Sequence, residues 1–201
     1  FNERILINGG IRLSSFTHYG PFDRYLKDGT GNLGSLSTDS TIKYNAWEPI
    51  KTYYGFEPRF SSRILINELS SIKLGFNQNY QYIHLASTSS VSLPTDLWVP
   101  SSALIEPKFS EQYALGFFKN FKENMYETSI EAYYKDMTNL IEYKEGVLPE
   151  DNTNSSSDDA FVFGNGESYG AEFLIKKNKG KTTGWIGYTI SKTTRYFDDV
   201  N

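Results

Sequence analysis

Hydrophobic and polar residues alternate with a period of two along most of this chain, and helical periodicity is nearly absent. A period of two is typical of β-strands that have one apolar and one polar face. The alternating segments are 5–16, 56–66, 72–82, 112–121, 126–135, 168–176 and 182–191. The pattern predicts an all-β chain of about seven strands, each roughly 10 residues or more and longer than the usual strand of a soluble sheet.

The two expected faces differ sharply in charge. In 72–82, for example, the apolar positions are Ile72, Leu74, Phe76, Tyr80 and Tyr82. Phe118 and Lys119 break the alternation near a turn. Almost all charged residues of the seven segments fall on the opposite face, namely Arg12, Glu57, Arg59, Arg63, Lys73, Glu127, Glu131, Lys135, Glu172 and Lys176.

The connections between the segments alternate in length. Long connections cover 17–55, 84–110 and 137–166, and short ones cover 67–71, 122–124 and 177–181. Short turns join antiparallel neighbours. We therefore expect an antiparallel sheet with its short turns at one end and its long loops at the other.

Two architectures contain such strands. In a soluble β-sandwich the apolar face packs on a second sheet, whereas in an outer-membrane barrel it faces lipid and the polar face lines an aqueous lumen. The strand lengths suffice to cross a bilayer at a tilt, and the loop asymmetry is typical of barrels. Tyrosines near strand ends fit the aromatic girdles of such barrels, namely Tyr80, Tyr82, Tyr113, Tyr126, Tyr134 and Tyr169. These features favour an antiparallel transmembrane β-barrel segment and leave the sandwich as an alternative.

The composition is consistent with a barrel wall. Hydrophobic residues are 38% of the chain and the mean hydropathy is -0.49, although there are 15 Tyr and 14 Phe. A wall that faces lipid on one side needs only one apolar residue in two. The net charge of -4 without a basic tract gives no indication of nucleic-acid binding. The lack of cysteine excludes disulfides and thiolate metal sites within these residues.

Several stretches together resemble the barrel domain of TonB-dependent outer-membrane receptors of the Bacteroidetes type. They are EPRFSSR (57–63), NQNYQYIHLAS (77–87), SLPTDLWVPSS (92–102), IEPKFSEQYALGFFKN (105–120), IEAYYKDMTNLIEYKEG (130–146) and GESYGAEFLIKKNKGKTTGWIGYTISKTTRYF (166–197). The resemblance implies a 22-stranded barrel in the cell outer membrane, plugged by an N-terminal domain. It also implies uptake of a scarce extracellular ligand, powered through TonB.

Seven strands cannot close a single-chain bacterial barrel, which has an even number of strands. Both chain ends read as cuts through a larger architecture. We therefore expect residues 1–201 to be a partial barrel domain, with the plug and the other strands outside this chain. The expected partners are outer-membrane lipid, the TonB complex through that plug, an unidentified extracellular ligand and a possible surface lipoprotein. A passive porin or a small OmpA-type barrel is the other membrane alternative.

Candidate ligand contacts are aromatic residues in the loops and arginines on the polar face. Aromatic rings suit glycans and siderophores, and guanidinium groups suit carboxylates or phosphates. The candidates are Trp47, Tyr53, Tyr54, Arg12, Arg59 and Arg63. The proline-punctuated stretch 91–107 is expected to be a structured ledge, with Leu97, Trp98 and Val99 folded back onto neighbouring loops or the barrel rim.

The sequence suggests no cofactor, metal site or enzyme activity. His18 and His84 are expected at exposed strand–loop junctions, without a third ligand. The run DNTNSSSDD (151–159) lacks the ligand spacing of a calcium loop and is expected to be a solvated loop. Glu127 and Glu131 share a face, but charge is ordinary in a barrel lumen. No nucleophile motif is present.

Overall fold

A computed structural model describes residues 4–27, 38–86, 97–144 and 160–197, and in these the fold is all-β. The run 151–159 lies outside them. The strands are β1 (Ile5–Tyr19), β2 (Phe22–Lys27), β3 (Thr38–Tyr44), β4 (Pro49–Asn67), β5 (Ser70–Gln81), β6 (Ile83–Ala86), β7 (Leu97–Pro100), β8 (Lys108–Phe121), β9 (Tyr126–Tyr143), β10 (Phe161–Lys177) and β11 (Gly184–Phe197).

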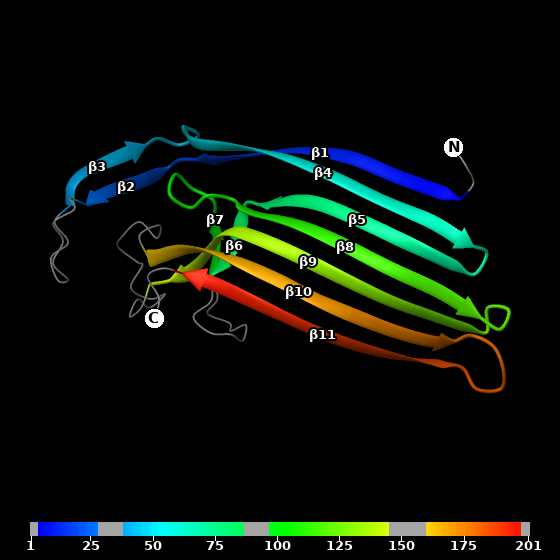
Figure 1. Ribbon diagram of the computed structural model, residues 1–201. Helices are drawn as coiled ribbons and strands as arrows, with labels where there is room; N and C mark the ends of the chain where they lie inside the picture. The colour runs from blue at the N-terminus through cyan, green and yellow to red at the C-terminus, as the bar shows by residue number, and fades with distance from the viewer. Residues whose placement is uncertain (1–3, 28–37, 87–96, 145–159, 198–201) are drawn as a thin grey trace.

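Seven long strands form one antiparallel sheet, in the order β1-β4-β5-β8-β9-β10-β11. Figure 1 shows this sheet as a single layer, with the short β4–β5, β8–β9 and β10–β11 turns at one end and the longer connections at the other. The predicted all-β class, antiparallel pairing and number of long strands are confirmed.

The seven long strands have 12 to 19 residues, in agreement with the predicted 10 or more, and most extend beyond the alternating segments. The segment 17–55 was expected to be a loop, but it contains the ends of β1 and β4 and the β2–β3 hairpin. The segment 84–110 likewise contains most of the β6–β7 pair. Backbone pairing continues past the region where one face is apolar, so hydrophobic alternation underestimates the length of these strands.

The pairing register assigns every residue of the long strands to one of two faces. Ile7 pairs with Ser62 and Ser62 with Leu74, so these three residues share the apolar face. Leu6 pairs with Arg63 and Arg63 with Lys73 on the opposite, polar face. Followed across all seven strands, the register places each of the ten predicted strand charges on the polar face, which confirms that prediction.

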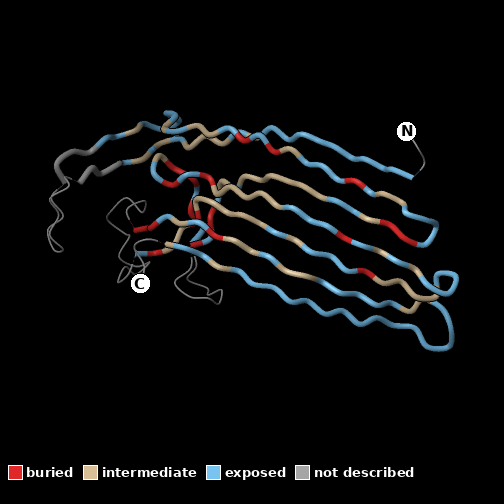
Figure 2. The backbone as a smooth tube through the Cα atoms, in the orientation of Figure 1, coloured by how far each residue is buried: buried red, intermediate tan, exposed pale blue. Residues whose placement is uncertain are grey.

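No second layer covers either face of this sheet within the described residues. Figure 2 shows that most of the sheet is exposed or half-buried, with buried positions scattered along it and gathered at the long-loop end. The buried hydrophobic cluster lies at that end and consists of Ala86, Val99, Ile105, Tyr143, Ala160 and Phe161. The loops at that end therefore have a packed core of their own.

The ledge was predicted for 91–107, of which 91–96 lie outside the described residues; residues 97–107 do form a structured ledge. The Ser102 amide donates to the Ile105 carbonyl, and the Ser101 amide donates to the Tyr82 carbonyl. Asn139 on β9 donates to the carbonyl of Pro107. The prediction that Trp98 folds back onto neighbouring loops or the rim is wrong. In the β6–β7 pair, Val99 points into the buried cluster and Trp98 points outward, 63% exposed.

The expectation that His84 is exposed is also wrong. Its side chain is buried under the ledge, and its Nε2 lies 3.2 Å from the Ser101 hydroxyl. Burial lowers the pKa of His84 to about 4, with a smaller contribution from the nearby Lys108 cation. His84 is therefore neutral at pH 7 and belongs to the packing of the ledge.

Candidate functional site

The apolar face carries a band of mainly apolar side chains, many of them large, across the seven strands. The rows lie about 7 Å apart along the strands. One row runs Ile5–Ile64–Ile72–Phe117–Ile130–Phe173–Tyr188, and the next runs Ile7–Ser62–Leu74–Leu115–Ala132–Ala171–Ile190. Many of these residues are exposed, including Leu115 at 53% and Ile190 at 58%. Monomeric soluble proteins rarely expose an apolar surface of this extent, and such a surface marks a contact with other protein or with lipid.

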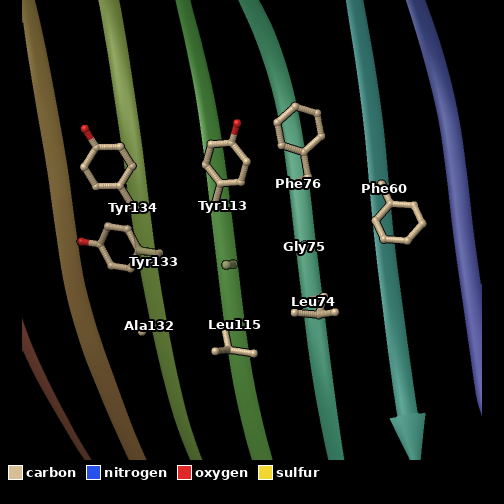
Figure 3. Close-up of a pocket in the computed structure, with 10 residues that line it drawn as sticks. Phe60, Leu74, Gly75, Phe76, Tyr113, Leu115, Ala132, Tyr133 and Tyr134 are labelled. Atoms are coloured by element: carbon tan, nitrogen blue, oxygen red, sulfur yellow. The ribbon is translucent and has the colours of Figure 1, made fainter.

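An aromatic row borders this band on the long-loop side. It consists of Phe60, Phe76, Tyr113, Tyr134 and Tyr169 on adjacent strands. Figure 3 shows that the first four of these rings lie side by side around a shallow hollow above Leu74 and Leu115. The ring centroids of Phe76 and Tyr113 are 5.0 Å apart. The predicted tyrosines Tyr113, Tyr134 and Tyr169 thus lie at a single level.

Directly beyond the aromatic row, the same face becomes acidic. Glu111, Asp136 and Glu167 pair with one another in the next row. The Tyr113 hydroxyl donates to Glu111, with an O–O distance of 3.2 Å. The tyrosine ring therefore lies in the apolar band while its hydroxyl reaches a charged row, which is the arrangement of interfacial tyrosines.

The turn end of the apolar face has a second aromatic level. Phe121 pairs with Tyr126, and the Nζ atoms of Lys119 and Lys122 lie over these two rings, 5.0 Å and 5.8 Å from the respective centroids. The alternation break at Lys119 is thus a lysine whose ammonium extends toward the strand end. On β8, Phe121 lies eight positions after Tyr113, about 27 Å along the strand. A strand tilt of about 40° would reduce this separation to about 20 Å, which is comparable to the roughly 25 Å height of the apolar band in membrane barrels.

The polar face has a buried carboxylate near the long-loop end. Glu57 on β4 is 0% exposed. Its Oε1 accepts a hydrogen bond of 2.6 Å from the Ser14 hydroxyl. Its Oε2 lies 3.7 Å from Arg12 Nη1 and 4.0 Å from Arg59 Nη2. Two guanidinium groups therefore share a single buried carboxylate.

Aromatic residues border this carboxylate on the loop side. The Tyr82 hydroxyl lies 2.7 Å from the Ser14 hydroxyl, and its ring stacks on Phe16 with centroids 5.4 Å apart. Tyr82 was predicted on the apolar face. It lies instead beside Ser14 and Phe16 of the polar face, just after the end of β5 at Gln81. Gly55 provides the space, since a Cβ atom at that position would come within 2.5 Å of both hydroxyl oxygens.

Three of the predicted site residues lie in or beside this cluster. Arg12 and Arg59 both contact Glu57. Tyr53 pairs with Phe16, and its hydroxyl donates a 2.6 Å hydrogen bond to the Ser102 carbonyl of the ledge. Tyr53 thus connects the sheet to the ledge.

The other three predicted residues lie elsewhere. Arg63 is on the polar face, four residues from Arg59 toward the turns and paired with Lys73. Tyr54 is on the apolar face and 81% exposed. Trp47 is at the turn between β3 and β4, with a φ of 67°, and its ring lies 6.5 Å from that of Tyr19. The six residues therefore do not form one site.

Ser14, Glu57 and Tyr82 were not predicted as site residues. Alternation alone indicates that Ser14 and Glu57 share the polar face with Arg12 and Arg59. It gives no indication that Glu57 is buried, because that depends on the register between β1 and β4. The one signal in the sequence is that Glu57 lies two residues before Arg59, on the same face of the expected strand.

Among the described residues, no group of three or more His, Asp or Glu side chains is arranged to hold a metal ion. In the same residues there is no helix long and apolar enough to cross a membrane. No family model matches this sequence, no curated protein matches it, and no solved structure matches its fold.

Proposed function

We propose that this chain is part of the wall of an outer-membrane β-barrel, with its apolar face against lipid and its polar face toward a water-filled interior. The observation that carries the proposal is the apolar band of a single-layer sheet, bounded at both ends by aromatic side chains. Hydrocarbon requires apolar side chains in the middle of the membrane and favours Tyr, Trp and lysine stems at its two interfaces.

The sheet edges support the same proposal. Within the described residues, the outer edges of β1 and β11 have no strand partner. Unpaired backbone groups at a long edge favour association with further strands. In a membrane these groups must be satisfied, and a barrel satisfies them by closure. We propose that additional strands of the protein pair with both edges.

Within that architecture, we propose a segment of a TonB-dependent receptor that imports a scarce extracellular ligand, rather than an enzyme. The support is the resemblance of the stretches in 57–197, together with long loops at one end that have their own core. A passive porin or an OmpA-type barrel would use the same wall. The complete coding sequence distinguishes a receptor from a porin or an OmpA-type barrel. A receptor would have a further N-terminal domain of about 100–150 residues that plugs the barrel interior.

Membrane location is tested by fractionation of cells that express the full-length protein. The proposal predicts that the protein sediments with the outer membrane and stays there after carbonate extraction. It also predicts that the protein migrates differently on gels before and after boiling, as closed barrels do. Recovery in the soluble fraction after osmotic lysis would contradict the proposal and would favour a β-sandwich that packs Phe60 and Ile130 on a second sheet.

A further inference from the structure

The polar face has a strong local excess of positive charge on three neighbouring strands. Five cationic side chains of β1, β4 and β5 share this face with one carboxylate, Glu57; the five are Arg12, Lys51, Arg59, Arg63 and Lys73. The chain as a whole has a net charge of -4. The excess of positive charge therefore arises because strand pairing brings these five residues onto one face, and it is not evident from the net charge of the chain.

Glu57 holds two of these cations together. Arg12 Nη1 and Arg59 Nη2 lie 3.7 Å and 4.0 Å from the same Oε2 atom, so these two nitrogens are no more than 7.7 Å apart, the sum of the two distances. The Ser14 hydrogen bond fixes the carboxylate from its other oxygen. The Asn79 side-chain carbonyl accepts from Arg59 Nη2, at 3.2 Å. The two guanidinium groups are thus positioned before any ligand arrives.

Both guanidinium groups retain the capacity to bind a second anion. The side chains of Arg12 and Arg59 are 61% and 52% exposed, whereas that of Glu57 is 1% exposed. A guanidinium has five N–H donors, and a single carboxylate cannot use all ten donors of the pair. One carboxylate also leaves one positive charge of the pair uncompensated.

We infer that Arg12 and Arg59 form a binding site for an oxyanion group, a phosphate or a carboxylate, on the polar face near the long loops. Planar guanidinium groups bind such oxygens in pairs of parallel hydrogen bonds. The two nitrogens are close enough for one such group to accept from both, at about 2.8 Å on each side. The inference rests on the proposed function in one respect, namely that the polar face lines a water-filled interior.

Lys73 and Arg63 are not part of this site. The Lys73 Nζ lies 4.0 Å from the centre of the Phe118 ring on the same face, so the Lys73 ammonium makes a cation–π contact with Phe118. Arg63 lies four residues along β4 from Arg59, about 13 Å away along the strand. These two cations contribute to the positive potential that attracts an anion. They do not belong to the oxyanion site formed by Arg12 and Arg59.

The test is a calorimetric titration of the purified full-length protein with inorganic phosphate at constant ionic strength. We expect saturable binding to the wild-type protein and at least a tenfold loss of affinity in the R12Q/R59Q double variant. The matched control is R195Q, which removes one positive charge from the polar face of β11; it should change the affinity less than twofold. Absence of saturable binding to the wild-type protein, or equal binding by R12Q/R59Q, would overturn the inference.

A second variant guards against misassembly. R12K/R59K retains both charges but removes the planar forks, and its affinity should lie between those of the wild-type and glutamine variants. If R12Q/R59Q does not assemble, the inference is tested with R12K/R59K alone. Phosphate affinity equal to that of the wild-type protein in R12K/R59K would overturn the inference that the guanidinium groups bind the oxyanion. Cell fractionation tests the membrane location separately. The phosphate titration measures binding by Arg12 and Arg59 whether or not the protein is found in the membrane.

Discussion

Ser14 donates a hydrogen bond of 2.6 Å to the buried carboxylate of Glu57, its diagonal neighbour across β1 and β4. The bond satisfies one carboxylate oxygen, and Arg12 and Arg59 neutralise the other. A buried charge is tolerated only when it is both paired and hydrogen-bonded. The Ser14–Glu57 bond therefore holds the arginine pair in place.

Replacing Glu57 with alanine should destabilise the protein. The change leaves Arg12 and Arg59 facing each other without the carboxylate between them, and it removes the acceptor of the Ser14 hydroxyl. We expect a loss of about 2–3 kcal/mol for Glu57→Ala and about 1 kcal/mol for Ser14→Ala, which removes the hydrogen bonds of the Ser14 hydroxyl and leaves both arginines beside the carboxylate. Urea unfolding of the vesicle-reconstituted protein measures both. Equal losses for the two variants would show that the carboxylate does not organise the cluster.

Gly55 should not tolerate a side chain. A Cβ atom there would approach the Ser14 and Tyr82 hydroxyls to 2.5 Å and the Tyr80 ring to 2.9 Å. Gly55→Val should separate Ser14 from Tyr82 and destabilise the fold by about 1–3 kcal/mol, as other overpacked sites do. The control is Gly10→Ala on the same face, where a Cβ atom meets nothing within 4 Å. A stability for Gly55→Val equal to that of Gly10→Ala would contradict the packing described around Tyr82.

Charge should be tolerated on one face of the sheet and not on the other. Leu115 lies in the middle of the apolar band, and Ser191 lies on the polar face next to Ile190, which shares the row of Leu115. Leu115→Arg should cost about 2–4 kcal/mol of folding free energy in a bilayer, and Ser191→Arg about 1 kcal/mol or less. Folding into vesicles over a urea series measures the difference. A similar cost for the two substitutions would be inconsistent with a lipid-facing apolar band.

The ledge should weaken in acid because of His84. Its pKa falls from 6.5 to about 4 on folding, so between these values the unfolded chain binds more protons than the folded one. The contribution of His84 is complete above pH 6.5 and is lost as the pH falls toward 4. Between pH 6.5 and pH 4.5 the loss should be about 2 kcal/mol. Urea unfolding at the two pH values should show this loss in the wild-type protein and not in His84→Gln, with His18→Gln as the control. An identical pH dependence in His84→Gln would refute the role of His84.

The alternation predicted the two faces because any apolar environment, whether lipid or a second sheet, selects every second residue of a strand. It could not distinguish the two environments, and it placed Tyr82 on the apolar face because it assumed that β5 continues past Gln81. Where the chain leaves the sheet, the period of two no longer applies.

Three features depend on pairing between strands and so were not visible in the sequence. The acidic residues Glu111, Asp136 and Glu167 lie far apart in the chain, and only the register of β8, β9 and β10 makes them one row beyond the tyrosines. The burial of Glu57 depends on the β1–β4 register. The position of Val99, and not Trp98, in the loop core depends on the pairing of β7 with β6.

Spin labels at Leu115→Cys and Ser191→Cys, in a full-length protein whose residues outside 1–201 are also freed of cysteine, test the central claim most directly; residues 1–201 contain no cysteine. In the reconstituted full-length protein, the label at 115 should be relaxed mainly by oxygen, which concentrates in lipid. The label at 191 should be relaxed mainly by a water-soluble nickel chelate. This pair of results would support a wall between lipid and water. Access of the nickel chelate to the label at 115, or exclusion of both reagents from it, would contradict the claim.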